Sequence, residues 1–232
     1  MTPVSLSAAA EQRIYRKVSY GPLLDVFMID LRSYRGPNTT NDQPAPSELT
    51  KFLGRQQIDW LKQELKQSKA TWKVISSDMP IGLIVRDGSD NFENGANGDG
   101  PALGRELDIA ELLKSIKDNN VTNTVWLTAD VHYAAAHYYS PETAVYKDFN
   151  PFWEFVSGPL HAGTFGPNAL DNTFGPKVVW NSIPEDLDPN RSPLDGFQFY
   201  GEVSIDAQTK AMTVRQFNLK NEELFRQEIP AN

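Results

Sequence analysis

Three short apolar runs, separated by two segments with helical spacing, constrain the fold of this chain most strongly. The runs are Leu24–Asp30, Thr71–Ser76 and Thr124–Thr128, each bounded by turn-forming or charged residues. Between them, apolar side chains in Leu53–Leu65 and Leu107–Ile116 recur every three or four residues, which is typical of one face of an amphipathic helix. This alternation of buried strands and helices predicts an α/β domain with helices packed on a parallel or mixed sheet.

The last third of the chain has a different pattern, rich in β-strand signals. Residues alternate between apolar and polar in Gln198–Ile205 and Ala211–Leu219, on either side of a turn-rich segment. These two runs predict an antiparallel hairpin, to which Glu223–Ile229 adds a third strand. Glycine and proline dominate Phe155–Gly196, and glycine, asparagine and aspartate dominate Asp87–Gly100, so both segments are predicted to be loops.

Charge and composition exclude several classes of function. The 232 residues include 22 Lys and Arg against 30 Asp and Glu, for a net charge of −8. No basic face remains to bind a phosphate backbone, so we expect no nucleic-acid partner. The longest apolar stretch, Leu23–Leu31, is interrupted by Asp25 and Asp30, so we expect no membrane span. Cysteine is absent, which excludes a disulfide framework and a cysteine nucleophile.

The sequence Asp130-Val131-His132 stands directly after the run Thr124–Thr128. Open α/β sheets bind ligands at the carboxyl ends of their strands. Strand alternation would let the Asp130 and His132 side chains project the same way, so that a carboxylate and an imidazole bind one cation. The alternative is an aspartate that caps a turn beside a hydrogen-bonded histidine.

Several local motifs occur in a fixed order along the chain: Phe27–Asp30, Asp30–Arg35, Gln56–Leu61, Val74–Pro80, Asn97–Gly100, Ala129–His132 and Phe152–Pro159. These motifs, together with the order of the elements, resemble the metal-dependent phosphoesterases of the calcineurin-like superfamily. The resemblance is greatest to the PhoD-like (alkaline phosphatase D) phosphatases, and it runs from about Tyr15 to about Phe225. The resemblance implies a metallophosphatase-type sandwich of mixed β-sheets flanked by helices, and the hydrolysis of phosphate esters.

The resemblance also implies which residues hold metal ions. The last superfamily motif is Gly-Asp-x-His in PhoD-like proteins, and it matches Asp130 and His132, with Ala129 in place of glycine. Asp78 stands where the wider superfamily has a ligand histidine. It is either a carboxylate ligand or a turn residue that precedes Met79 and Pro80. Calcium and iron are the ions that the family uses.

Three further residues are candidates for the chemistry of phosphate transfer. Arg32 and Arg35 follow a strand end, where their planar guanidinium groups can pair with a phosphate, or instead form salt bridges with nearby acids. His161, in the loop Gly158–Asn168, is a candidate proton donor to the leaving group; the alternative is a surface histidine. The segment 91–100 is either a lid over the substrate or simply a mobile loop.

The motifs of the family's amino-terminal half have no counterpart in Met1–Tyr20. Residues 1–232 therefore resemble the carboxyl-terminal portion of a single PhoD-like domain, in which two or three ligands are too few for two metals. We expect little or no phosphatase activity from this polypeptide alone. The family is exported, which implies a periplasmic or extracellular location, although Met1–Arg13 lacks a signal peptide and reads as a surface lead-in.

The sequence leaves one other class of function open and disfavours another. An incomplete sandwich exposes an apolar sheet face, so the chain is alternatively an inactive module that binds a missing amino-terminal segment, another partner or a second copy of itself. A Ser-His-Asp hydrolase is disfavoured, because the motif Gly-x-Ser-x-Gly is absent: Val156 precedes Ser157-Gly158 where glycine would be needed.

Overall fold

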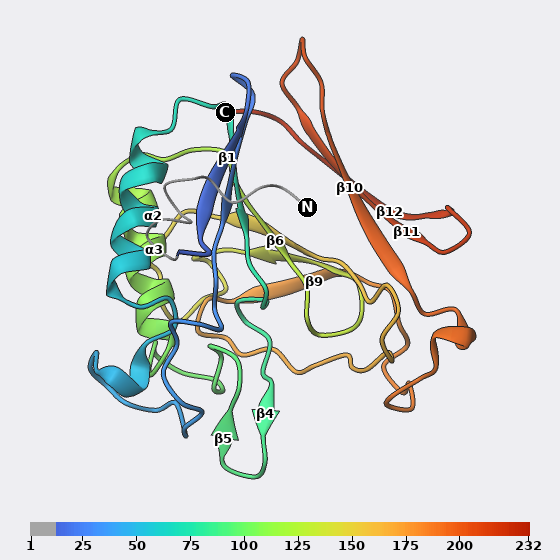
Figure 1. Ribbon diagram of the computed structural model, residues 1–232, viewed down its shortest axis with the longest axis horizontal. Coiled ribbons are helices and arrows are strands. Elements are labelled where there is room, and N and C mark those ends of the chain that lie inside the picture. The colour runs from blue at the N-terminus through green and yellow to red at the C-terminus, as the bar shows by residue number, and fades with distance from the viewer. Residues whose placement is uncertain (1–12) are drawn as a thin grey trace.

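A seven-stranded mixed sheet forms the centre of the computed structural model, which describes residues 13–232 (Figure 1). Its strand order is β1-β2-β3-β6-β8-β7-β9. The strands are β1 (Arg16–Tyr20), β2 (Leu24–Met28), β3 (Trp72–Ser76), β6 (Thr124–Thr128), β7 (Ala135–Tyr139), β8 (Phe152–Val156) and β9 (Pro176–Asn181). The neighbours β2, β3, β6 and β8 run parallel, whereas β1, β7 and β9 are antiparallel to the strands they pair with. The carboxyl ends of four strands therefore meet at one edge of the sheet.

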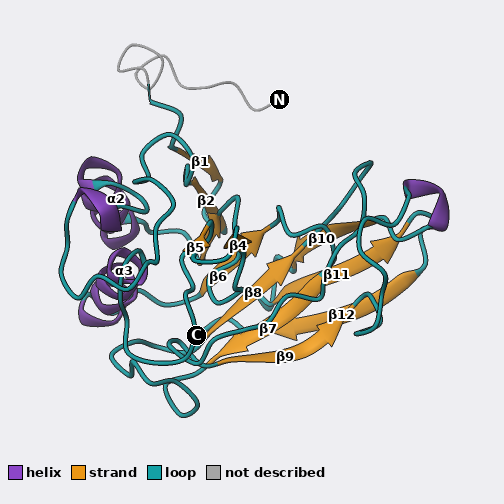
Figure 2. Cartoon of the chain, turned by 90° about the horizontal axis from the view of Figure 1, so that it is seen from below, coloured by secondary structure: helices purple, strands orange, loops and turns teal. Residues whose placement is uncertain are grey.

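Two helices, α2 (Arg55–Gln67) and α3 (Glu106–Asp118), cover one face of this sheet (Figure 2). Each helix turns an apolar stripe inward, as the spacing predicts, and keeps its charged residues in solvent. The buried side chains of the stripes are Ile58, Leu61 and Leu65 on α2, and Ile109, Leu113 and Ile116 on α3. Short 3-10 helices lie at η1 (Glu48–Thr50) and η2 (Pro193–Asp195).

A second, three-stranded antiparallel sheet packs on the other face (Figure 2). It consists of β10 (Phe199–Ile205), β11 (Met212–Asn218) and β12 (Glu223–Ile229), so the predicted hairpin and third strand are present. Met212 and Val214 are fully buried against the large sheet, and the rings of Trp180 and Phe225 stack with centroids 5.2 Å apart. The second sheet thus covers the apolar face of the large sheet at these residues, whereas Leu127 on β6 remains half-buried.

Several elements differ from the sequence prediction. The sequence analysis does not predict the strands β1, β7 and β8, and β9 lies inside the segment predicted to be loop. The predicted loop Asp87–Gly100 contains part of a minimal hairpin of β4 (Arg86–Asp87) and β5 (Asn91–Phe92). The predicted surface lead-in falls mainly on residues 1–12, outside the described residues. Within the described part of the chain, no helix has the length and apolar character to cross a bilayer.

A buried polar network fixes the segment that follows β3. The fully buried carboxylate of Glu154 accepts hydrogen bonds from the Ile81 N–H (2.7 Å) and the Tyr139 hydroxyl (2.8 Å), and it lies 3.0 Å from Nδ1 of His137. The Tyr139 oxygen in turn accepts from the Gly82 N–H at 3.0 Å. Burial, reinforced by Glu154, raises the pKa of Tyr139 well above its usual value. His137 thus has a structural role, and the chain just beyond Asp78 is held rigidly.

Candidate functional site

A cavity of about 400 Å³ lies past the carboxyl end of β6, beside the β4–β5 hairpin. Its walls come from four separate segments: the turn after β2, the hairpin, the loop after β6 and the loop after β8. It is lined by Arg32, Val85, Glu93, Asp130, Val131, His132, Phe165 and Asn168. The two residues of the Asp-x-His motif therefore share one cavity, as the sequence predicts.

The reason why Asp130 and His132 face the same cavity differs from the predicted one. Strand β6 ends at Thr128, so strand alternation does not govern these side chains. Both residues instead have left-handed backbones, with φ of 73° at Asp130 and 68° at His132. This conformation is costly for residues other than glycine and often occurs at functional sites. Two left-handed residues around Val131 turn both side chains to one side.

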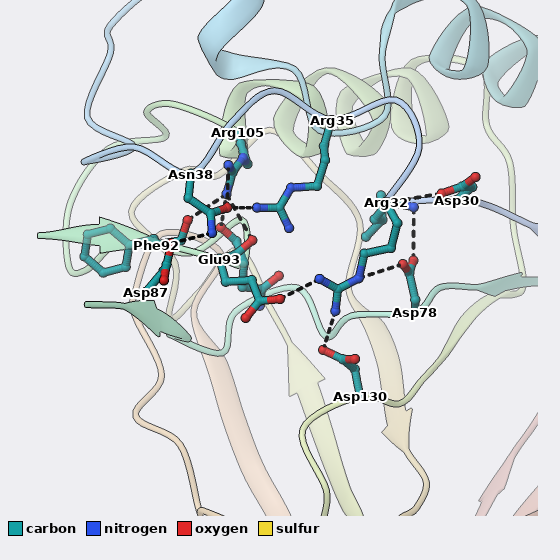
Figure 3. Close-up of polar contacts among 12 residues, drawn as sticks. Asp30, Arg32, Arg35, Asn38, Asp78, Asp87, Phe92, Glu93, Arg105 and Asp130 are labelled. Atoms are coloured by element: carbon teal, nitrogen blue, oxygen red, sulfur yellow. Dashed lines mark hydrogen bonds and ion pairs between the residues drawn. The ribbon is translucent and has the colours of Figure 1, made fainter. Parts of the chain in front are cut away.

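The Arg32 guanidinium is surrounded by carboxylates (Figure 3). Its Nη1 donates to Glu93 at 2.5 Å and its Nη2 to Asp130 at 2.9 Å, while Nε lies 3.6 Å from an oxygen of Asp78. Partial burial lowers the pKa of Arg32, but Glu93 and Asp130 outweigh that effect and raise it above its usual value. The arginine stays charged, and three acids around one cation make the cluster net acidic when they are ionised. The salt-bridge alternative for Arg32 is therefore present in the structure.

Asp30 and Asp78 hold the turn that carries Arg32. One oxygen of Asp30 accepts the N–H groups of the two residues after Leu31, both at 2.8 Å. Gln57 of α2 pairs with the Asp30 backbone, accepting from its N–H and donating to its carbonyl. Asp78 accepts from the Leu31 N–H at 3.1 Å, and burial raises its pKa. Asp78 thus ties its own segment to the turn after β2, and it lies beside the cavity without lining it, so its assignment as a ligand or as a turn residue remains a prediction.

Arg35 lies outside the cavity lining. Its guanidinium donates to the side-chain oxygen of Asn38 (Figure 3). Burial, and then the nearby charge of Arg32, lowers the pKa of Arg35. The structure therefore brings Arg32 to the candidate site and places Arg35 behind it, in contact with the loop at Asn38.

Arg105, at the start of α3, joins two loops that flank the site, a role that no motif in the sequence indicates. It is completely buried. Its Nη1 donates to the carbonyls of Phe92, Glu93 and Asn94 at 2.9, 3.0 and 3.2 Å, and Nη2 donates to the Pro37 carbonyl at 2.5 Å. Arg105 thereby positions the backbone from which Glu93 reaches Arg32.

A buried pair of carboxyl groups, Glu106 and Asp171, fastens the base of the loop 91–100. Glu106 is 1% exposed and Asp171 is 3% exposed. Burial and the neighbouring Asp171 raise the pKa of Glu106 to about 10, so Glu106 is protonated at neutral pH and hydrogen-bonds to Asp171. Next to this pair, Asp99 accepts the Asn172 N–H at 2.9 Å. This end of the loop is thus tethered to the body of the domain.

The structure separates the two candidate histidines. Nδ1 of His132 lies 2.6 Å from the Gly163 carbonyl, which can only accept, so Nδ1 donates this hydrogen bond and Nε2 is the ring nitrogen left to face another group. The Phe165 ring packs edge-on against His132, with centroids 5.3 Å apart. His161 is exposed in the same loop and does not line the cavity. Its predicted role as a proton donor remains a prediction.

The donor groups fit a metal in kind but fall short in number. A carboxylate of Asp130 and the free Nε2 of His132 are the ligands that a hard or borderline cation takes, and hydrogen-bonding of Nδ1 to a carbonyl is typical of ligating histidines. Yet among residues 13–232 no three or more His, Cys, Asp or Glu side chains are grouped to hold a metal ion. The cavity therefore presents two side chains of the kinds that bind metals, which are too few to hold an ion by themselves.

Comparison with known proteins identifies the family. A family model described as "PhoD-like phosphatase" matches residues 1–216. The chain belongs to the PhoD-like phosphatase family. Alkaline phosphatase D of Bacillus subtilis (strain 168) is 28% identical to this PhoD-like chain over 184 residues, which make up 73% of the chain and 30% of that protein. A solved structure titled "Structure of PhoD" aligns with a TM-score of 0.49 at 16% identity, covering 95% of this chain and 44% of the other.

Membership in the PhoD-like family confirms the resemblance found in the motifs and places the chain in a family of hydrolases. The chain spans less than half the length of both relatives.

Proposed function

We propose that this chain takes part in the metal-dependent hydrolysis of phosphate esters, as the carboxyl-terminal portion of a PhoD-like phosphatase domain. One observation carries the proposal: Asp130, His132 and Arg32 line the same cavity at the carboxyl edge of the sheet. In this proposal Asp130 and His132 supply two metal-binding groups and Arg32 supplies one phosphate-binding group, in a chain that belongs to a phosphatase family. On family grounds alone, we also propose that the protein works in the periplasm or outside the cell.

In this proposal Asp130 and Nε2 of His132 are metal ligands, with calcium and iron as the ions suggested by the family. When bound, such an ion acts as a Lewis acid that stabilises negative charge on the phosphoryl oxygens. The left-handed backbones at both residues keep the two side chains turned into the cavity before any ligand arrives. The remaining ligands have to come from outside the described residues, or from water and substrate.

Arg32 is proposed to orient the phosphoryl group. Its guanidinium presents two N–H groups in one plane, a geometry that matches two oxygens of a phosphate. Glu93 and Asp130 already hold both Nη atoms at the cavity wall, so the side chain is ordered where substrate would meet it. To bind phosphate, Arg32 exchanges at least one of these carboxylates for a phosphoryl oxygen.

Replacing Arg32 with methionine should change the binding of cations and of phosphate in opposite directions. Loss of the guanidinium frees Asp130 and removes a positive charge, so Mn²⁺ should bind about three- to tenfold more tightly. Phosphate should bind about tenfold more weakly, because its charged hydrogen-bond donor is gone. Calorimetric titration measures both. Arg86→Met, on the exposed strand β4, is the matched control, and a parallel change in both affinities would contradict this role for Arg32.

Binding of inorganic phosphate tests the proposed function directly. We expect phosphate to bind only when Mn²⁺ or Ca²⁺ is present, and to lose most of its affinity in Asp130→Ala. Hydrolysis of p-nitrophenyl phosphate should stay near background, because the described residues provide only two metal-binding groups. Metal-independent phosphate binding would contradict the function. Rapid metal-dependent hydrolysis by this chain alone, abolished by Asp130→Ala, would contradict the view that its site is partial.

The short donor set also favours a second candidate, in which the chain is catalytically inactive and completes a site by binding another polypeptide. The half-buried Leu127 and the unpaired edge of β10 lie where a further strand can join the second sheet. A clean monomer with cooperative melting would count against this candidate. Stoichiometric association with an amino-terminal PhoD-like segment, with recovery of activity, would support it.

A further inference from the structure

A second cavity, of about 410 Å³, lies far from Asp130 along the strands. It is formed at the amino ends of β3, β6 and β8, and the last residues of the chain, including Ile229 and Asn232, make one wall. Figure 1 shows the carboxyl terminus at the end of the molecule opposite the β4–β5 hairpin, which borders the Asp130 cavity. The volume falls within the range of ligand pockets. The proposed phosphatase function makes no use of this site.

The lining of this second cavity carries no charged side chain. Charged residues make up 22% of the sequence, yet none of the residues that line the cavity is Asp, Glu, Lys, Arg or His. A charged ligand such as a phosphate would gain no ion pair there. The side chains that line the cavity are therefore suited to an uncharged ligand, which separates them chemically from the acidic cluster around Arg32.

Aromatic rings form one corner of the cavity. The Tyr138 and Trp153 side chains meet across β7 and β8 with centroids 5.0 Å apart and planes inclined by 55°. Trp153 is backed by Phe155, stacked at 5.6 Å, so its ring is held in place. The apolar face of a fixed ring packs well on the C–H groups of a sugar. Two inclined rings do not make the parallel slot that a flat base would fill.

Free hydrogen-bonding groups accompany the rings. The Thr122 hydroxyl, the Asn150 amide, the Tyr138 hydroxyl and Trp153 Nε1 have no hydrogen-bond partner among the described residues, although all four residues line the cavity. Together they offer neutral donors and acceptors of the kind that sugar hydroxyls need. Asn123, by contrast, is occupied: its amide pairs with the backbone of Asn232 and fixes that wall.

We propose that this second cavity binds one sugar unit of a neutral saccharide, with Tyr138 and Trp153 packing on the ring and Thr122 and Asn150 bonding its hydroxyls. Such a site, remote from Asp130, anchors the protein to carbohydrate without taking part in hydrolysis. Its existence does not depend on the proposed phosphatase function, because it shares no lining residue with the Asp130 cavity.

Saturation-transfer NMR with glucose, galactose and N-acetylglucosamine tests the proposal, with adenosine and inorganic phosphate as other ligands. We expect transfer from at least one sugar, with the tryptophan fluorescence of the protein changing over the same concentrations. Thr122→Ala and Asn150→Ala should each raise the Kd about three- to tenfold, the loss expected for one hydrogen bond. Both residues are exposed, so folding should be unaffected, and Gln208→Ala on a distant turn is the matched control.

Three results would overturn the proposal. One is no saturation transfer from any of the sugars at tens of millimolar. The second is sugar binding that Asn150→Ala and Thr122→Ala leave unchanged, which would place the sugar elsewhere. The third is adenosine binding at this cavity in preference to every sugar, which would assign it to planar aromatic ligands.

Discussion

Replacing Arg105 with methionine is expected to lower the free energy of unfolding by about 3–5 kcal/mol. Methionine replaces part of the apolar stem but no donor. The carbonyls of Pro37, Phe92, Glu93 and Asn94 would then lose the charged group that bonds them inside the protein. Burial already lowers the pKa of Arg105 to about 10, which indicates how far the guanidinium is removed from water.

Urea denaturation measures this effect, and Arg86→Met provides the control. Arg86 is exposed on β4 and lies over the Phe92 ring, so its replacement should change stability by less than about 1 kcal/mol. If Arg105→Met unfolded at the same urea concentration as the parent, the loops around Glu93 would be held by other contacts. The role assigned to Arg105 would then be wrong.

Replacing Glu106 with glutamine is expected to stabilise the protein, and more so as the pH rises. The pKa of Glu106 is about 10 in the folded chain, against an ordinary value of 4.5. Between pH 4.5 and about pH 10, Glu106 keeps its proton in the folded protein and releases it in the unfolded chain. Stability therefore falls with rising pH, by up to about 1.4 kcal/mol per pH unit. Glutamine does not titrate and still donates to Asp171, so this loss disappears.

Thermal melts at pH 6 to 9 test the prediction. The melting temperature of the unmodified protein should fall by several degrees across this range. That of Glu106→Gln should stay nearly constant and lie at least about 4 °C higher at pH 8. Glu111→Gln on the same helix is the control. Arg55, and with it Lys62, holds the pKa of Glu111 down to about 2, so that change should destabilise the protein with no slope over this range. A parent that melts at one temperature throughout would contradict the protonated pair.

The sequence predicts those elements whose burial is signalled by apolar residues close together in the sequence. Strands β2 and β6 run parallel to β3 and consist of buried and half-buried residues, so they read as nearly continuous apolar runs that the sequence analysis predicts as strands. Strand β1 is an exposed edge with a mostly polar sequence, and β9 (Pro176–Asn181) lies among prolines and glycines. Their strand character depends on pairing with β2 and β7, which the local sequence does not specify.

The candidate site was only partly predictable for the same reason. Asp130 and His132 are two residues apart, so a motif reveals them. Glu106 and Asp171 are far apart in the sequence, and a glutamate at a helix start ordinarily indicates a favourable charge near the helix dipole. Arg105 bonds backbone carbonyls, which every residue has, so the sequence does not mark its partners. The structural partners of these buried groups become visible only in three dimensions.

Titration of the chain with Mn²⁺ tests most directly whether Asp130 and His132 bind one cation. Asp130→Asn and His132→Gln should each weaken binding by about tenfold or more, with Asp206→Asn on an exposed turn as the control. If both residues hold the same ion, the fold-loss of Mn²⁺ affinity in the double variant should be smaller than the product of the losses in the two single variants. Unchanged affinity in either single variant, or effects that simply multiply, would contradict a shared site.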